Sequence, residues 1–232
     1  IEFDGDPLYQ SHHIDAHRRA AQQFLESDHA YSCYCTPEEL ETKRKQAQSE
    51  KRTIKYDGTC RDLSPDQRAE REERGLPGVV RFRVPPGETV WTDLIRGVQR
   101  WDNEDIGDFV VLRADGSPVY QLAVVVDDHE MGVTLVLRGA DHLSNTPKQI
   151  LMFRALGWDV PQYAHNSFTL GSDKKKLSKR HGATTVTEYR DRGYLPEAFY
   201  NFLAILGWSP DDEREFFTRD ELIGVFTIEG MT

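Results

Sequence analysis

Five of the seven residues from Lys174 to Arg180 are cations, although the chain as a whole has a formal net charge of −10 at pH 7. Gly171 and Gly182 flank this run, and a hydrophobic, strand-like segment precedes it. Such a loop can be a solvated surface segment, a nucleic-acid patch or a flexible loop that holds a polyphosphate. Aromatic residues usually interleave the cations of a nucleic-acid patch, and none do so here. The sequence therefore favours a polyphosphate loop over a nucleic-acid patch, with a solvated loop as the simple alternative.

A loop that grips a polyphosphate has to present positive charge, hydroxyls and backbone N–H groups to phosphate oxygens. Lys176 and Lys179 would supply the charges, and Ser178 would supply a hydroxyl. Two unit charges at contact distance attract by roughly 4 kcal/mol at an effective dielectric of about 20. Lysines that engage oxygens gaining charge during a reaction would therefore account for a large part of a catalytic effect. These three residues are the catalytic candidates.

Cys33, Cys35 and Cys60 form the second group that could do chemistry. A C-x-C pair followed by a third cysteine after 24 intervening residues offers three thiolates, one fewer than a tetrahedral zinc ion takes. In a small polar segment with little core of its own, metal ligation would contribute folding free energy on the order of several kcal/mol. Three free thiols without a metal are the alternative.

The composition excludes several classes of protein. The chain has 232 residues, of which 38% are hydrophobic and 29% charged, as in ordinary globular domains. No apolar run approaches the length that spans a membrane, and the odd count of three cysteines fits a reducing cytosol. The acidic balance disfavours a general affinity for nucleic acid but leaves room for a local basic patch. No export signal and no initiator Met are visible, so we expect a piece of a longer protein.

The string K-L-S-K-R at 176–180 resembles the K-M-S-K-S-type loop of class I aminoacyl-tRNA synthetases. The segments at 137–150, 170–184 and 194–210 are similar to bacterial-type glutamyl-tRNA synthetase, as are Y-C-T-P-E-E-L near 34–40 and V-V-D-D-H at 125–129. A five-residue string arises by chance, but an ordered series over essentially the whole chain does not. The resemblance thus identifies the chain as a fragment of a glutamyl-tRNA synthetase.

The resemblance implies ATP-dependent activation of L-glutamate to glutamyl-adenylate and transfer to the acceptor end of tRNA-Glu. It implies ATP with Mg²⁺ as cofactor and a cytoplasmic monomer without a membrane partner. Its ATP-binding positions are Lys176, Leu177, Ser178, Lys179 and Arg180, with Lys179 as the family's marked contact, and Asp141 beside the nucleotide. Its substrate-binding positions are Tyr120, Arg138, whose planar fork suits a γ-carboxylate, and Val124, where some members carry Asn.

The family also holds zinc in its acceptor-stem insertion, through a C-x-C…C set and a fourth ligand. The positions that supply the fourth ligand in different members hold Asp62 and Tyr56 here. Both can ligate through oxygen, and a carboxylate is the commoner ligand. The resemblance therefore predicts a structural zinc site of Cys33, Cys35, Cys60 and Asp62, with Tyr56 in place of Asp62 as the alternative.

One departure from the family pattern concerns the second ATP motif, a H-I-G-H-like string that follows the first strand. The string S-H-H-I-D at 11–15 is not that motif, because no strand or Gly-rich turn precedes it. We therefore expect a chain that lacks the first strand and the anticodon-binding domain and is inactive alone. The alternatives are a non-catalytic tRNA-acceptor-binding fragment and a paralogue similar to glutamyl-Q tRNA-Asp synthetase. The K-L-S-K-R-H-G string followed by the stem-contact start speaks against the paralogue.

Capping and turn signals predict the elements that must position these residues. Helices are expected at 13–26, 36–48, 64–74, 146–156, 187–192 and 195–207. Strands are expected at 79–84, 88–94, 109–113, 119–126, 133–137 and 164–170, with A-D-G-S-P as a hairpin turn and 133–137 buried on both faces. This alternation predicts an α/β fold.

With the resemblance, we expect a partial Rossmann-like class I synthetase catalytic domain with an inserted small α+β acceptor-stem-binding domain. Residues 1–32 would be the C-terminal part of the first Rossmann half, 33–105 the insertion with its zinc-type site, 106–186 the second half with the basic loop, and 187–232 the start of the stem-contact helical region.

Overall fold

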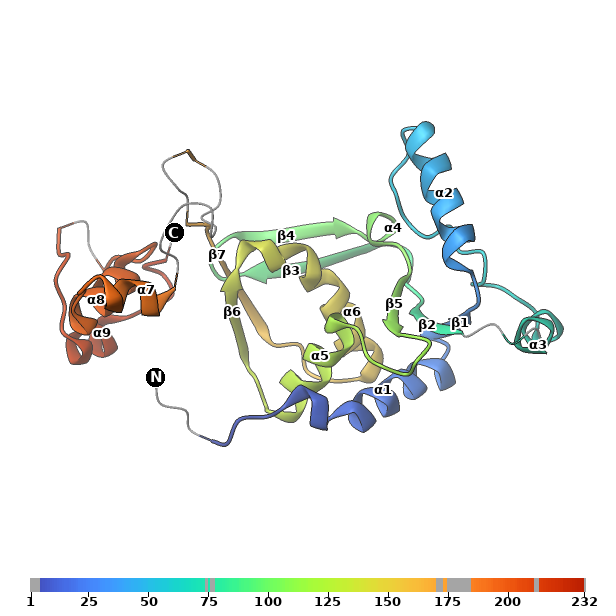
Figure 1. Cartoon of the computed structure of the whole chain (residues 1–232), viewed down its shortest axis with the longest axis horizontal. Coiled ribbons are helices and arrows are strands. Elements are labelled where there is room, and N and C mark those ends of the chain that lie inside the picture. The colour runs from blue at the N-terminus through green and yellow to red at the C-terminus, as the bar shows by residue number, and fades with distance from the viewer. Residues whose placement is uncertain are drawn as a thin grey trace. The chain divides into compact units, whose positions relative to one another are not determined.

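The computed structural model in Figure 1 describes residues 5–73, 75, 78–169, 173–174, 185–210 and 213–231, and the statements below concern these residues. The fold is mixed α/β, as the sequence predicts. The chain divides into two compact units. The first comprises Ile1–Trp91, Arg100–Thr134 and Ser144–Pro161, and the second comprises Thr92–Gln99, Leu135–Leu143 and Gln162–Thr232.

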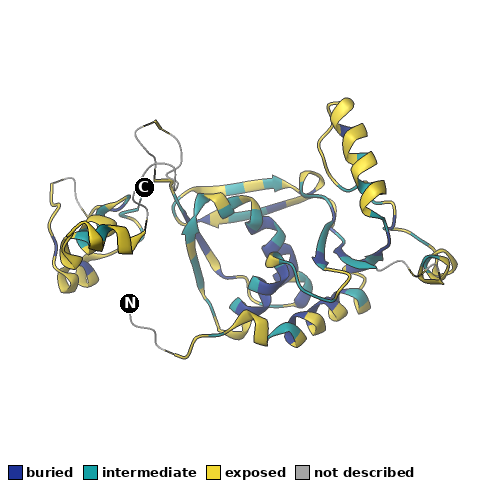
Figure 2. Cartoon of the chain, viewed as in Figure 1, coloured by how far each residue is buried: buried dark blue, intermediate teal, exposed yellow. Residues whose placement is uncertain are grey.

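The first unit is built around a small antiparallel sheet covered by helices. Its strands β1 (Ala30–Cys33), β2 (Val79–Phe82) and β5 (Phe109–Leu112) lie in the order β1-β2-β5. Its helices are α1 (Ile14–Glu26), α2 (Pro37–Ser49), α3 (Pro65–Glu73), α4 (Asn103–Ile106), α5 (Tyr120–Glu130) and α6 (Thr146–Leu156), preceded by the 3₁₀ turn η1 (Gln10–His12). Figure 2 shows the buried residues gathered where α1, α5 and α6 meet, and Phe24, Phe82, Leu122 and Phe153 belong to this core.

The second unit contains the parallel part of the fold. Strands β6 (Leu135–Gly139) and β7 (Gln162–Asn166) pair in parallel along their whole length. Strand β3 (Glu88–Asp93) also runs parallel to β7, and β4 (Gly97–Asp102) completes the order β4-β3-β7-β6; the second unit contains the end of β3 and the start of β4, at 92–99. The turn η2 (Ala140–Asn145) follows β6. Helices α7 (Val186–Asp191), α8 (Pro196–Ile205) and α9 (Arg219–Val225) follow, with Trp208, Phe217 and Leu222 in a small core of their own. Within the described part of the chain, no helix combines the length and the apolar character that crossing a membrane requires.

The helix starts that the sequence marks most clearly are confirmed. Thr36 accepts the backbone N–H of Glu39, whose side chain accepts the N–H of Thr36, so the predicted capping box opens α2 with Pro37 at its first turn. Two further capping boxes open α7 at Thr185 and α9 at Thr218. The box at Thr218 was present in the sequence, and it would have predicted α9.

The strand predicted at 119–126 is wrong, because these residues form helix α5. Leu122, Val125 and Val126 are buried at helical spacing, and they face α1 and α6 in the core of the first unit. A short apolar run gives the same signal for a buried strand and a buried helix, and β-branched valines favour the strand. The turn at 114–118 does form, but it leads from β5 into a helix and not into the second arm of a hairpin.

Strand β6 differs from its prediction in burial. It was expected to be buried on both faces, yet Leu137 is 43% exposed. The reason is its position, since β6 lies at the end of the sheet order. Strand β7 covers 162–166 and so ends before the predicted 164–170 does. Strands β1 and β4 and the short helix α4 were not predicted, because short elements with mixed polarity give little periodic signal.

Candidate functional site

The predicted polyphosphate loop lies outside the described residues. This applies to Lys176, Leu177, Ser178, Lys179 and Arg180. Their roles in ATP binding and catalysis therefore remain predictions. The strand that leads toward them, β7, carries His165 near its carboxyl end.

Arg138 lies next to the last residue of β6, in register with His165 on β7. Its Nε donates a hydrogen bond of 3.1 Å to Nε2 of His165, and Nη2 donates one of 3.4 Å to the backbone carbonyl of His142. The guanidinium also lies 5.5 Å from the ring centroid of Tyr163, within the range of a cation–π interaction. The candidate substrate-binding arginine is thus half-buried and held on several sides by its own unit.

His165 is in turn held by Asp93 at the end of β3. Nδ1 of His165 and Oδ2 of Asp93 are 2.5 Å apart, and both side chains are fully buried. Oδ1 of Asp93 accepts three backbone hydrogen bonds, from the N–H groups of His165 at 3.1 Å, Ile95 at 3.2 Å and Arg96 at 3.0 Å. One carboxylate therefore fixes both the imidazole and the chain that leaves β3.

The electrostatics of this pair follow from its contacts. Burial raises the pKa of Asp93, but the hydrogen bonds from His165, Arg96 and Ile95 outweigh burial and bring it below its ordinary value. The pKa of His165 is also lowered, because burial and the charges of Arg138 and Arg96 outweigh the attraction of the carboxylate. At neutral pH the pair is therefore a carboxylate and an uncharged imidazole.

The remaining predicted positions for glutamate lie in the first unit, and the predicted nucleotide contact Asp141 lies in the second. Tyr120 is the first residue of α5 and is exposed, and half-buried Val124 follows four residues later on the same helix. Asp141 is exposed in η2 of the second unit. A Cβ at Gly139 would lie 2.6 Å from Oδ1 of Asp141, so the placement of this carboxylate requires glycine at the end of β6.

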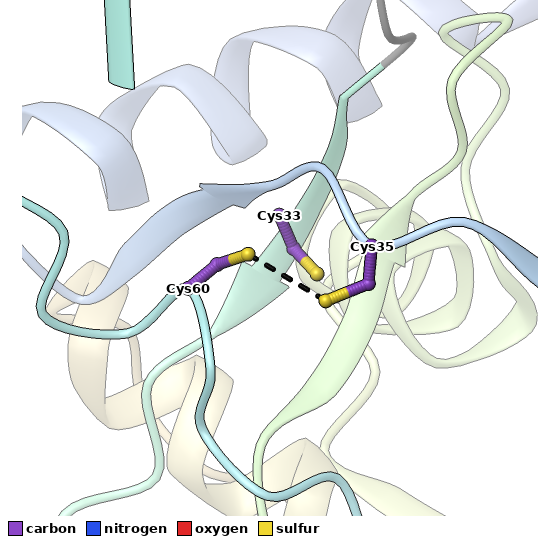
Figure 3. Close-up of side chains that lie close together, drawn as sticks. All are labelled: Cys33, Cys35 and Cys60. Atoms are coloured by element: carbon purple, nitrogen blue, oxygen red, sulfur yellow. Dashed lines mark hydrogen bonds between the residues drawn. The ribbon is translucent and has the colours of Figure 1, made fainter. Parts of the chain in front are cut away.

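The three cysteines come together, as their spacing predicts. Figure 3 shows Cys33, Cys35 and Cys60 pointing toward one another, and their sulfur atoms all lie within 4.8 Å of one another. The sulfurs of Cys35 and Cys60 are 3.6 Å apart, too far for a disulfide of about 2.05 Å. A tetrahedral ion with metal–sulfur bonds of about 2.3 Å would place its sulfurs about 3.8 Å apart. The spacing therefore fits a shared metal ion.

Tyr56, and not Asp62, lies at this thiol cluster. Its hydroxyl oxygen is 3.3 Å from the sulfur of Cys33 and 3.5 Å from that of Cys35, and it accepts the backbone N–H of Cys60 at 2.9 Å. The carboxylate of Asp62 is 82% exposed and accepts a hydrogen bond of 3.0 Å from Arg83. Of the two residues considered for the fourth ligand, the structure brings Tyr56 to the sulfurs.

The thiols differ in acidity. Burial raises the pKa of Cys33, but hydrogen bonds with Tyr56 and Arg81 outweigh burial and leave that pKa below its ordinary value. Burial, together with the neighbouring thiols, raises the pKa of Cys35 to about 12. The guanidinium of Arg81 lies 3.8 Å from the ring centroid of Tyr56, where it places a positive charge beside the thiol cluster. Three thiolates at once would need a further cation among them.

The chain matches a family model over residues 1–232, described as the catalytic domain of class I tRNA synthetases for E and Q. It belongs to this family. The synthetase chain is 51% identical over 232 residues to the glutamate–tRNA ligase of Geobacter sulfurreducens, covering 100% of this chain and 48% of that relative. It is 49% identical over 232 residues to the glutamate–tRNA ligase of Aquifex aeolicus, covering 99% of this chain and 49% of that protein.

A solved structure supports the fold of the synthetase chain. A glutamate tRNA ligase from Elizabethkingia meningosepticum, determined in complex with its amino acid, superposes with a TM-score of 0.88 at 34% identity. The match covers 98% of this chain and 51% of that one. The synthetase chain thus spans about half the length of the curated relatives and solved structures that it matches.

Asp93 and His165 were not singled out from the sequence of the synthetase chain. They are separated by 72 residues, and neither lies in a motif with a characteristic spacing. A signal does exist in retrospect, since both residues stand at or near the carboxyl ends of neighbouring parallel strands. Polar residues at such ends often line a binding site.

Proposed function

We propose that this chain is part of an enzyme that activates L-glutamate with ATP and Mg²⁺ and transfers it to the acceptor end of tRNA-Glu. The observation that carries the proposal is the half-buried guanidinium of Arg138, anchored at the carboxyl end of a strand in a parallel sheet. Ligands of open α/β sheets bind at that edge, and a planar arginine fork suits a carboxylate. The names of the relatives support the same substrate.

In this proposal, Lys176 and Lys179 hold the triphosphate while the α-carboxylate of glutamate attacks the α-phosphorus, the α–β phosphoanhydride bond breaks and pyrophosphate leaves. Positive charge that meets the developing charge of the transition state lowers the barrier of this step. Arg138 binds the γ-carboxylate of glutamate, and Tyr120 and Val124 stay substrate-binding positions that the resemblance implies. Asp141 lies beside the nucleotide.

Glutamate-dependent ATP–pyrophosphate exchange by the product of the full reading frame tests this function. We expect exchange with glutamate, none with aspartate, and a loss of about 100-fold or more in Lys179→Ala. The 232-residue chain alone is expected to be inactive. A full-length protein that exchanges no pyrophosphate with glutamate, while it binds tRNA-Glu, would support the second candidate function below.

The second candidate function is a tRNA-acceptor-binding module without catalysis. A groove of about 830 Å³ between α2 and the segment 51–57 is lined by Lys43, Lys51, Arg52 and Lys55. Lys43 pairs with Asp57 at 2.7 Å, so part of this charge is balanced within the groove. Cations along a groove suit a phosphate backbone, whose binding weakens steeply with salt. In either function we propose that 33–105 is the acceptor-stem insertion and that the protein works as a cytoplasmic monomer.

We also propose that the thiol cluster holds a structural zinc ion through Cys33, Cys35, Cys60 and Tyr56. The sulfur spacing, the burial and the nearby hydroxyl support this ligand set. Zinc would supply the positive charge that lets the thiols ionise together and would tie β1 to the segment before α3. Protein purified without chelator should contain about one zinc ion per chain by elemental analysis, and Cys60→Ser should contain much less. A zinc-free wild type would leave three free thiols.

A further inference from the structure

We propose that His165 is a positioning residue for carboxylate recognition, an imidazole that accepts the Nε–H of Arg138 and holds the guanidinium with its outer N–H groups toward the substrate. The inference rests on the proposed function, because it assigns to Arg138 the γ-carboxylate of glutamate. It adds two residues, His165 and Asp93, that neither the sequence motifs nor the resemblance point to.

The hydrogen bonds define which ring nitrogen carries the proton. Asp93 is a carboxylate that accepts at both oxygens, so Nδ1 of His165 has to be the donor across the 2.5 Å contact. An uncharged imidazole then has a bare Nε2, which can only accept. Arg138 has only donors, and its Nε lies 3.1 Å from that nitrogen. Each contact is thus compatible with one tautomer, with the proton on Nδ1.

The ring is held by the backbone as well as by Asp93. The N–H of His165 donates to Oδ1 of Asp93 at 3.1 Å, and its carbonyl accepts a hydrogen bond of 3.1 Å from Nε of Arg96. The ring of Tyr163 lies nearly parallel to the imidazole, with ring centroids 6.1 Å apart. The acceptor for Arg138 is therefore fixed in place before any ligand arrives.

A fixed acceptor at Nε has a consequence for binding. An arginine can meet a carboxylate side-on, through Nε and one Nη, or end-on, through its two Nη groups. Because His165 takes the Nε–H, this geometry disfavours the side-on approach through Nε. Holding a long side chain in one orientation also lowers the entropy that is lost when the ligand binds. His165 should therefore affect glutamate binding far more than ATP binding.

Two substitutions separate the two hydrogen bonds of the ring. His165→Asn places an amide N–H near the position of Nδ1–H, which keeps the donor to Asp93 and removes the acceptor for Arg138. His165→Gln places an amide oxygen near the position of Nε2, which keeps the acceptor and removes the donor. His29→Asn is a matched control in the first unit, where the exposed ring contacts Ser27.

The experiment measures glutamate-dependent ATP–pyrophosphate exchange and thermal stability in the full reading frame. We expect His165→Asn to raise the KM for glutamate by about 10- to 100-fold, as for one hydrogen bond to a charged group, with the KM for ATP within about twofold. His165→Gln should raise the KM for glutamate less but lower the Tm more, because the buried Asp93 loses a donor. Arg138→Lys has no Nε–H, so adding His165→Asn to it should change the KM for glutamate little further.

Several outcomes would overturn the inference. They are an unchanged KM for glutamate in His165→Asn, equal rises for glutamate and ATP, and a double variant that shows the two single effects simply added. If His165→Asn does not fold, the test uses folded His165→Gln. A rise in its KM for glutamate as large as that in Arg138→Lys would also overturn the inference. A wild type without glutamate-dependent exchange would instead refute the proposed function, and the role of His165 would fall with it.

Discussion

The two polar clusters of this chain, the Asp93–His165–Arg138 network in the second unit and the thiol cluster in the first, differ in how far their charges are balanced within the chain. In the Asp93–His165–Arg138 network the ring proton and the Nε–H of Arg138 have acceptors within the chain, and the charges are a carboxylate and a guanidinium joined by a neutral ring. In the thiol cluster, three sulfurs and the hydroxyl of Tyr56 lie beside the guanidinium of Arg81, and one such charge is too few for three thiols to ionise together. The difference fits the two proposals, in which the first network binds a ligand without further change and the second takes up an ion.

Metal removal should give the largest effect. Stripping zinc from the loaded protein with a chelator is expected to lower the free energy of unfolding of the first unit on the order of several kcal/mol, because the ligands lose their shared cation. The backbone N–H of His165, in the second unit, should stay protected from hydrogen exchange. Calorimetry with exchange mass spectrometry measures both, and a chelator that leaves the melting curve unchanged would contradict the zinc proposal.

The second-largest effect is expected from Asp93→Ala, which removes the carboxylate of the Asp93–His165–Arg138 network. It leaves the buried backbone N–H and Nδ1–H of His165 without an acceptor, together with the part-buried N–H groups of Ile95 and Arg96, and should lower the free energy of unfolding by about 3 kcal/mol or more. Urea denaturation checks this. Asp62→Ala is the matched control, since its carboxylate is exposed, and equal losses in the two variants would show that burial does not matter here.

A smaller effect on zinc affinity should distinguish Tyr56 from Asp62 as the fourth zinc ligand. Tyr56→Phe keeps the ring below the guanidinium of Arg81 and removes only the hydroxyl, so we expect zinc affinity to fall by about tenfold or more. Asp62→Ala should leave the affinity unchanged. Competition with a chromogenic chelator ranks the two variants, and the reverse ranking would return the site to the ligand set first expected from the sequence.

The smallest effect concerns pH. The pKa of His165 in the folded chain is lowered from its ordinary value of 6.5, so below that pH the unfolded chain takes up the proton first. Stability should therefore fall as the pH drops from 6.5 toward the folded pKa, by at most about 1.4 kcal/mol per pH unit for this group. Asp93 adds a loss only at more acid pH, below its ordinary value of 3.8.

Urea midpoints between pH 7.5 and 5 measure this dependence. The chain has eight histidines, so the comparison that matters is between the wild type and His165→Asn. The variant should show the shallower slope, because it lacks the buried ring between Asp93 and Arg138. A slope that is the same in both proteins would show that the folded imidazole titrates normally.

Local signals in the sequence predicted much of the fold. The capping box at Thr36 and the prolines at helix starts act over a few residues, and the structure confirms the helices that they mark. The spacing of the cysteines predicted that the thiols meet, and they do. The failure at 119–126 has a physical cause. Whether a run of valines forms a strand or a helix depends on the elements that pack against it, here α1 and α6.

The candidate site was harder to predict than the fold. The position of Asp93 against His165 depends on the pairing of β3 with β7, which no local pattern reveals. The orientation of Tyr56 depends on the path of the chain between α2 and Cys60. Sequence spacing found the thiols but favoured Asp62 from general ligand frequencies, since it could not tell which side chain turns inward.

The loop from Tyr56 to Cys60 also tethers helix α2. Of that helix, all of which the structure describes, Ala47 is the buried residue, so its attachment depends on few contacts. Its first turn begins two residues after Cys35, and in its middle Lys43 donates hydrogen bonds to Asp57 and Thr59, which lie within that loop. Both attachments of α2 thus lie beside cysteines of the thiol cluster, and we expect that opening the cluster frees the first turn and the middle of the helix and disorders the basic groove that it lines.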